Sequence, residues 1–193
     1  MDDFKGITPP PQLAEIDRET RLMGFNMASE PQTGSLLRTL AASKPRGKFL
    51  EVGTGTGYGT AWILDGMDAA SKLQTVDINP DVQSIARKHL GADGRLSFFT
   101  QDAIAFLATR QKNLYDFIFA DAMPGKFERF DLTLGLLKVG GILLLDDLLP
   151  QPNWPEGHAL KVERLLAQLD DLVGYHVSKL RWATGIVILT RIP

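Results

Sequence analysis

The chain has 193 residues, of which 44% are hydrophobic, so it can bury a sizeable core within a single domain. Its formal net charge is −2 and its basic residues form no continuous run, which argues against a nucleic-acid partner or an anionic membrane partner. It contains no cysteine, which excludes disulfides, thiolate metal sites and cysteine nucleophiles and fits a reducing, cytoplasmic environment.

The N-terminal segment is acidic and proline-rich and lacks the apolar stretch of a secretion signal. Beyond it, the spacing of Leu13, Ile16 and Leu22 predicts a short amphipathic helix over 13–22. Pro31 suits the first turn of a second helix, predicted over 31–43. We expect residues 1–45 to form a helical lid or interface segment of a single domain whose core spans 46–193.

From residue 48 onward, short apolar runs alternate with helical patterns. The predicted strands are 48–52, 73–76, 96–99, 115–120 and 142–145, and the predicted helices are 61–67, 80–90, 103–110 and 128–137. This alternation predicts a doubly wound α/β fold, with helices on both faces of a mostly parallel sheet. After a helix over 158–169, predicted strands 175–181 and 186–191 are joined by a turn that permits only antiparallel pairing.

The most informative segment is the glycine-rich turn that follows the first strand, Glu51-Val52-Gly53-Thr54-Gly55-Thr56-Gly57. A turn of this kind exposes backbone N–H groups at a helix start and lets a ligand approach the chain closely. The dinucleotide fingerprint requires a third glycine where Tyr58 stands. The carboxylate of Glu51 would repel a pyrophosphate but would favour the cationic groups of S-adenosylmethionine. The alternative is a strand–helix corner that binds no ligand.

Two further acidic residues follow neighbouring predicted strands. Asp77 ends the second strand, where a carboxylate can accept hydrogen bonds from both hydroxyls of a ribose. Its alternative role, capping the helix over 80–90, suits Asn79 better. Asp102 follows the third strand, where it either faces an adenine edge or caps the next helix.

On these motifs the chain resembles the class I S-adenosylmethionine-dependent O-methyltransferases of the catechol and caffeoyl-CoA group. The resemblance extends from about residue 20 to the end of the chain. It rests on Met27-Ala28-Ser29-Glu30, Phe49 to Tyr58, Val76-Asp77-Ile78-Asn79-Pro80-Asp81, Phe119-Ala120-Asp121-Ala122 and Gly140-Gly141-Ile142-Leu143-Leu144-Leu145-Asp146-Asp147.

This resemblance implies a Rossmann-like, seven-stranded sheet whose last strand is inserted antiparallel between the fifth and sixth. It implies that Glu51 and the glycines hold the methionine part of the cofactor, that Asp77 holds the ribose, and that the segment after the third strand holds the adenine. The cofactor-binding residues that it implies are Glu51, Gly53, Thr54, Gly55, Gly57, Tyr58, Asp77, Ile78, Gln101, Asp102, Ala103 and Asp121.

If the metal ligands of the family are assigned to the matching positions of this sequence, Asp121, Asp146 and Asp147 would bind a divalent cation. Because adjacent strands lie about 4.8 Å apart, carboxylates that end neighbouring strands can converge on Mg²⁺, Ca²⁺ or Mn²⁺; otherwise they cap loops without a metal. The sequence departs from the family pattern in having Asp147 for the usual asparagine and Pro124 for the usual catalytic lysine. We expect Asp121 and the nearest lysine, Lys126, to be catalytic, and the alternative for Lys126 is a solvated side chain in a mobile loop.

The proline-rich segment 148–155 follows the last of these carboxylates. This segment either forms a wall or lid over the methyl acceptor, with Trp154 facing it, or forms a rigid crossover loop with the indole of Trp154 packed into the protein. Trp182 is a weaker candidate for the same pocket, and His158 is expected at a solvent-exposed helix start.

The expected function is transfer of a methyl group from S-adenosylmethionine to a hydroxyl of a small molecule, assisted by a divalent metal ion. The alternatives are a metal-independent methyltransferase acting on another small-molecule nucleophile, an NAD-dependent oxidoreductase and a non-catalytic nucleotide-binding module. Neither nucleic acid nor a membrane is an expected partner, and a homodimer is the alternative use of the N-terminal helices.

Overall fold

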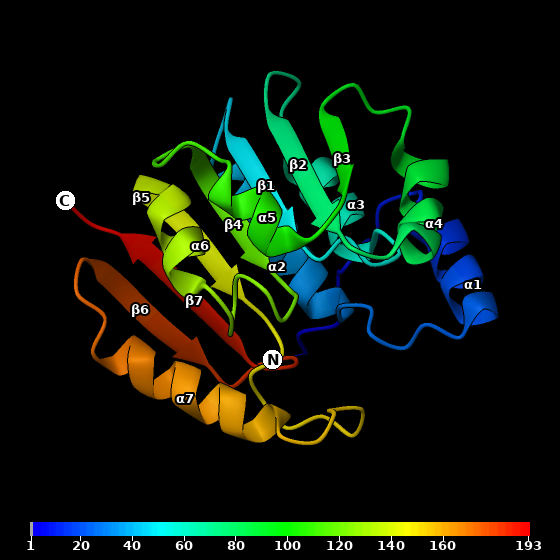
Figure 1. The fold of residues 1–193 in the computed structure, drawn as a ribbon. Helices are drawn as coiled ribbons and strands as arrows, with labels where there is room; N and C mark the ends of the chain where they lie inside the picture. The colour runs from blue at the N-terminus through cyan, green and yellow to red at the C-terminus, as the bar shows by residue number, and fades with distance from the viewer. Residues whose placement is uncertain (1) are drawn as a thin grey trace.

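The computed structural model describes residues 2–193, which form a seven-stranded sheet flanked by helices (Figure 1). The strands are β1 Lys48–Val52, β2 Lys72–Asp77, β3 Leu96–Thr100, β4 Tyr115–Ala120, β5 Leu137–Leu145, β6 Tyr175–Leu180 and β7 Ile186–Arg191. The helices are α1 Leu13–Met23, α2 Pro31–Ala42, α3 Tyr58–Gly66, α4 Pro80–Leu90, α5 Ala103–Ala108, α6 Phe130–Leu136 and α7 His158–Asp170.

The strand order is β3-β2-β1-β4-β5-β7-β6. Strands β1 to β5 pair in parallel, whereas β7 runs antiparallel to both of its neighbours, β5 and β6. The predicted doubly wound sheet, its antiparallel C-terminal hairpin and the inserted last strand are therefore confirmed. The direction of winding reverses between β1 and β4, and ligands of such sheets bind outside the carboxyl ends of the strands at this reversal.

Each face of the sheet has its own hydrophobic core, because successive side chains of a strand point to opposite faces. Phe49 of β1 belongs to the core that contains side chains of α1, α2, α3 and α4. The next residue, Leu50, belongs to the core that contains side chains of α5, α6 and α7. Because helices cover both faces of the sheet, the sequences of the central strands are nearly continuous apolar runs.

Most boundaries lie within two residues of those predicted, but the starts of α3 and β5 differ by more. Helix α3 begins directly after Gly57, whose φ of +94° is accessible to glycine, and a Cβ there would lie 2.7 Å from the Cβ of Ala86 in α4. The absence of that Cβ lets the start of α3 pack closely against α4. Strand β5 begins at Leu137, immediately after α6, and runs through Gly140 and Gly141. The predicted strand 142–145 is therefore too short at its N-terminal end, because the chain passes from helix to strand before this glycine pair.

The N-terminal helices lie against the same face of the sheet as α3 and α4 (Figure 1). The hydroxyl of Thr20 in α1 donates to that of Thr56 in the glycine-rich turn, at 2.9 Å. The loop between α1 and α2 then reaches the carboxyl ends of the central strands, where Phe25 and Met27 line a cavity. A search of the described helices found no segment with the length and hydropathy needed to span a bilayer.

Candidate active site

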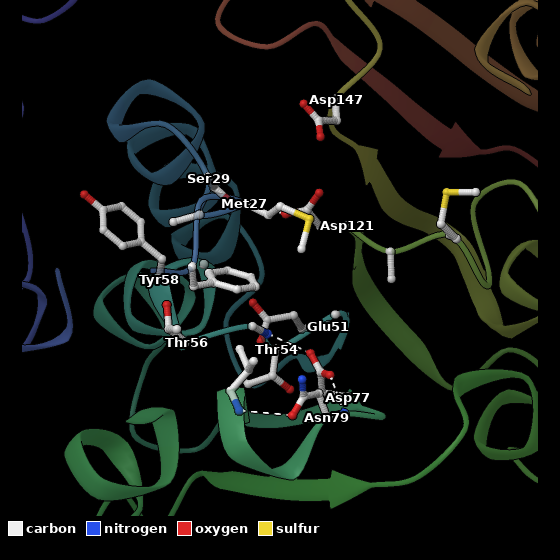
Figure 2. A pocket seen from close by; sticks show the side chains of 18 of the residues that line it. Met27, Ser29, Glu51, Thr54, Thr56, Tyr58, Asp77, Asn79, Asp121 and Asp147 are labelled. Atoms are coloured by element: carbon white, nitrogen blue, oxygen red, sulfur yellow. Dashed lines mark hydrogen bonds between the residues drawn. The ribbon is translucent and has the colours of Figure 1, made fainter. Parts of the chain in front are cut away.

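A cavity of about 380 Å³ lies at the carboxyl ends of β1, β2 and β4, on the predicted side of the sheet. Its volume falls in the range of about 300–1,000 Å³ that is usual for small-molecule sites. Its walls come from four parts of the chain: the loop before α2, the glycine-rich turn, the residues that follow β2 and β4, and the segment that leads into α7. Figure 2 shows Glu51, Asp77, Asp121 and Asp147 around it.

Glu51 is the most unusual polar residue of this cavity, because its side chain is only 1% exposed. Oxygen Oε2 accepts hydrogen bonds from the hydroxyls of Thr60, at 2.5 Å, and Thr75, at 2.6 Å, whereas Oε1 has no partner among the described residues. Burial raises the pKa of Glu51 to about 8; the two hydroxyls oppose this shift, and the carboxylates of Asp121 and Asp77 add to it. A buried acceptor without a partner favours a ligand that brings a donor or a positive charge.

Asp77 joins the end of β2 to the glycine-rich turn. Its Oδ2 accepts from the N–H of Gly55 at 2.8 Å, and its Oδ1 accepts from the N–H of Asn79 at 2.9 Å. The Asn79 side chain, not Asp77, caps α4, as the sequence predicted. The carboxylate of Asp77 is therefore held at the cavity wall, and each of its oxygens retains a second lone pair for a ligand.

Glycine is required where the turn passes the neighbouring strand. Gly53 has a φ of +99°, and a Cβ there would lie 2.6 Å from the backbone oxygen of Asp121. The backbones that follow β1 and β4 thus approach more closely than a side chain would permit. This contact places the turn and Asp121 on the same cavity.

The predicted cofactor residues fall into two groups. Glu51, Gly53, Thr54, Gly55, Tyr58, Asp77, Ile78 and Asp121 all line the cavity, whereas Gly57, Gln101, Asp102 and Ala103 do not. The side chain of Asp102 accepts from the N–H of Ala105 at 2.8 Å and caps α5, which is the alternative role that the sequence left open.

Lys126 lies inside the protein and lines the cavity, with 3% of its surface exposed. Its Nζ donates to the backbone oxygen of Asp146 at 2.9 Å, so the alternative of a solvated lysine is wrong. Burial raises the pKa of Asp121 despite the opposing charge of Lys126, and the nearby Asp147 adds to the shift. Oδ2 of Asp121 also accepts from the Ser29 hydroxyl at 3.2 Å.

The carboxylates that the resemblance assigns to a metal do not present a set of ligands. Asp146 is 2% exposed and does not line the cavity; its Oδ1 accepts from the Thr184 hydroxyl and, at 2.8 Å, from the N–H of Asp147. Across residues 2–193, no three His, Cys, Asp or Glu side chains are grouped as ligands of one ion. The predicted metal site at Asp121, Asp146 and Asp147 is therefore not supported. The carboxylate of Asp146 is hydrogen-bonded to Thr184. The positive charge of Lys126 lies near the carboxylates of Asp121 and Asp147.

Aromatic side chains form the wall between β5 and α7. Trp154 lines the cavity, and its ring centroid lies 4.5 Å from that of His158. His158 is 7% exposed and lies 5.1 Å from the ring of Phe127, so the predicted exposed position is wrong. Burial lowers the pKa of His158, and the charge of Lys126 lowers it further. Trp182 does not line this cavity; its indole N–H donates to Asp3 at 2.7 Å.

Sequence reasoning assigned no cofactor-binding or catalytic role to the loop before α2, although Met27-Ala28-Ser29-Glu30 is one of the motifs on which the resemblance rests. Phe25, Met27 and Ser29 line the cavity, together with Met123 beyond β4. Figure 2 shows Met27 and Ser29 on the side of the cavity where Asp121 lies. The available signals were that motif and the break between the two predicted N-terminal helices, and neither indicates which end of the sheet the loop reaches.

Comparisons with known proteins agree with this architecture. A putative O-methyltransferase of Mycolicibacterium vanbaalenii is 33% identical over 124 residues, a match that covers 61% of this chain and 54%, about half, of the relative. A probable caffeoyl-CoA O-methyltransferase of Arabidopsis thaliana is 26% identical, covering 94% of this chain and 89% of the relative.

Among solved structures, an O-methyltransferase of Streptomyces achromogenes in complex with S-adenosylmethionine has the same fold. Its TM-score is 0.84 at 20% identity, and the match covers 99% of this chain and 94% of that one. The family model described as O-methyltransferase matches residues 7–173. The chain therefore belongs to the O-methyltransferase family.

Proposed function

We propose that this protein transfers a methyl group from S-adenosylmethionine to a hydroxyl of a small molecule in the cytoplasm. The observation that carries the proposal is the buried carboxyl of Glu51, whose Oε1 has no partner in the described part of the chain and which lies at the wall of the cavity. A ligand with an ammonium group and a positively charged sulfur would supply the missing donor and charge. The pyrophosphate of NAD would instead add negative charge beside Glu51, Asp77 and Asp121.

The residues fit each part of that cofactor. Glu51 would accept a hydrogen bond from the methionyl amine, and Asp77 would accept from the ribose hydroxyls. The side chain of Ile78, which is 70% exposed at the cavity, offers an apolar surface for the adenine. When bound, S-adenosylmethionine supplies a methyl group on a sulfur that leaves as a neutral thioether.

We assign the acceptor hydroxyl to the neighbourhood of Lys126 and Asp121. Its oxygen forms the new bond to the methyl carbon as the carbon–sulfur bond breaks, and its proton must leave. Asp121, whose pKa burial raises, can accept that proton, and the ammonium of Lys126 stabilises negative charge on the oxygen. Holding the two reactants in line supplies much of the remaining acceleration.

The reaction that we propose does not pass through a metal ion, because Asp146 hydrogen-bonds to Thr184 and the positive charge of Lys126 lies near Asp121 and Asp147. Dialysis against EDTA should therefore change the rate of methyl transfer less than twofold, within the usual scatter of such contributions. The measurement is the initial rate before and after chelation and again after Mg²⁺ is restored. Loss of activity that Mg²⁺ alone restores would show that the carboxylates rearrange to hold an ion.

The first test is binding and turnover with a matched pair of variants, Asp77→Ala and Asp102→Ala. We expect the parent to bind S-adenosylmethionine and to methylate members of a panel of phenols and catechols. Asp77→Ala should weaken cofactor binding by about tenfold or more, since it removes a charged acceptor. Asp102→Ala should leave affinity unchanged and cost about 1 kcal/mol of stability, the usual effect of losing a helix cap.

Calorimetric titration and thermal unfolding make both comparisons. If the parent does not bind S-adenosylmethionine at millimolar concentration, the proposed function is wrong. If Asp102→Ala weakens binding as strongly as Asp77→Ala does, then Asp102 reaches the adenine when the cofactor binds.

We further propose that residues 1–45 act as a lid on residues 46–193, rather than as a homodimer interface. The loop between α1 and α2 supplies Phe25, Met27 and Ser29 to the cavity wall, and Ser29 donates to Asp121. Without this segment the reacting groups would be open to water on that side.

A further inference from the structure

Three buried polar atoms on one wall of the cavity make no hydrogen bond of normal geometry within residues 2–193. They are Nε1 of Trp154 and both ring nitrogens, Nδ1 and Nε2, of His158. Both residues line the cavity. Leaving a buried donor or acceptor unpaired costs about 1–3 kcal/mol, so native proteins rarely leave several together unless a ligand or water completes them.

The imidazole of His158 is held in place mainly by packing against two aromatic rings, with the backbone oxygen of Asp147 nearby. Its ring lies between Trp154, with centroids 4.5 Å apart, and Phe127, with centroids 5.1 Å apart and ring planes at 80°. The ring is 7% exposed and stands at the first residue of α7. The backbone oxygen of Asp147 lies close enough to the ring to raise its pKa, which favours the proton on the nearer nitrogen and leaves the other nitrogen as an acceptor for a ligand.

The surroundings of this wall suit a flat acceptor. Phe25, Met27 and Met123 line the cavity as apolar surfaces, and Lys126 also lines it. A neutral imidazole has one donor and one acceptor nitrogen, while an indole N–H can only donate. A ligand that satisfies the wall must therefore both donate to and accept from it, as a phenol with a neighbouring oxygen substituent does.

We propose that His158 and Trp154 form the acceptor subsite of this enzyme. His158 accepts the hydrogen bond of the neighbouring hydroxyl that is not methylated, and the indole N–H of Trp154 donates to the oxygen of that hydroxyl, while the methylated hydroxyl faces Asp121 and Lys126. This inference rests on the proposed function, because it names the part of the site that selects the acceptor.

The test compares His158→Phe and His158→Gln with the parent. The phenylalanine keeps a packed ring and removes both nitrogens, whereas the glutamine restores one polar end. We expect His158→Phe to raise the KM for a catechol about tenfold, the effect of losing one buried hydrogen bond of about 1.4 kcal/mol. His158→Gln should recover part of that loss, and the KM for S-adenosylmethionine should stay within about twofold of the parent's.

Trp154→Phe tests the second contact, and Trp182→Phe is its matched control outside the cavity. Trp154→Phe should raise the KM for a catechol about fivefold, as expected for one neutral hydrogen bond, and leave the KM for a phenol without the second oxygen unchanged. Catechol added to the complex with S-adenosylhomocysteine should change tryptophan fluorescence in the parent and in Trp182→Phe, but not in Trp154→Phe.

Thermal unfolding and affinity for S-adenosylhomocysteine test whether each variant is folded. If His158→Phe does not fold, the acceptor KM of His158→Gln and of Trp154→Phe is compared with that of the parent. If folded variants at both positions keep the parent's acceptor KM, water pairs these atoms and the inference is wrong, although the proposed function stands. A parent that binds the cofactor but neither methylates nor binds any phenol overturns both.

Discussion

Replacing Glu51 with glutamine should weaken S-adenosylmethionine binding about tenfold to a hundredfold, the range expected when a hydrogen bond to a charged group is lost. Glutamine keeps the shape and retains an oxygen for Thr60 and Thr75, but it removes the negative charge and places an amide N–H₂ where Oε1 meets the ligand. Calorimetric titration measures the change. Glu163→Gln, on the exposed side of α7, is the matched control and should bind like the parent.

The same substitution should stabilise the unliganded protein. Burial raises the pKa of Glu51 in the folded state to about 8, compared with about 4.3 when unfolded. Between these two pKa values the folded parent binds more protons than the unfolded chain. The stability of the parent therefore falls as the pH rises from about 4.3 to about 8. Glutamine does not titrate, so the variant does not lose this stability.

At pH 8 we expect Glu51→Gln to unfold about 5 °C above the parent, which corresponds to about 2 kcal/mol for a chain of this size. The difference should shrink towards about pH 4, where the parent's carboxyl is protonated in the folded state and largely protonated in the unfolded chain as well. Thermal unfolding at both pH values measures it. An equal melting temperature at pH 8, together with unchanged cofactor affinity, would mean that Glu51 is neither strained by burial nor part of the site.

Lys126→Met should lower kcat about a hundredfold to a thousandfold. This is the usual effect of removing one preorganised group that stabilises negative charge in the transition state. Methionine has nearly the length of the lysine stem, so the change mainly removes the ammonium that donates to the Asp146 backbone. Affinity for S-adenosylmethionine should change less than about threefold, because binding does not use this contact. Steady-state kinetics and cofactor titration separate the two effects.

Lys138→Met is the matched control for that variant. Lys138 pairs with Asp116 at 2.8 Å, near the start of β5 and away from the cavity, so its loss should leave kcat unchanged. A folded Lys126→Met enzyme with a kcat within threefold of the parent's would remove Lys126 from the chemistry and leave the acceptor without a positive partner.

The sheet and most of the cofactor site follow from local sequence. Strands β1 and β4 were predicted with their observed bounds, because covered parallel strands produce unbroken apolar runs with abrupt ends. Asp77 and Asn79 were assigned distinct roles because a helix cap has a strict position relative to the helix start. Glu51 was singled out because its charge is incompatible with a pyrophosphate.

The acceptor side could not be predicted in the same way, because its geometry depends on contacts between distant segments. Asp146 and Thr184, which are 38 positions apart, hydrogen-bond and remove a carboxylate from the predicted metal site. His158 follows prolines and a glycine, a pattern typical of exposed loops, yet the rings of Trp154 and Phe127 bury it. Neither contact has a periodic or spacing signal in the sequence.

A crystal structure with S-adenosylhomocysteine bound would examine the cofactor assignment at atomic level. We predict the methionyl amine within hydrogen-bonding distance of Oε1 of Glu51, and both ribose hydroxyls against the carboxylate of Asp77. Ligand density elsewhere on the molecule, or in this cavity with the sugar and amine turned away from both carboxylates, would contradict the account.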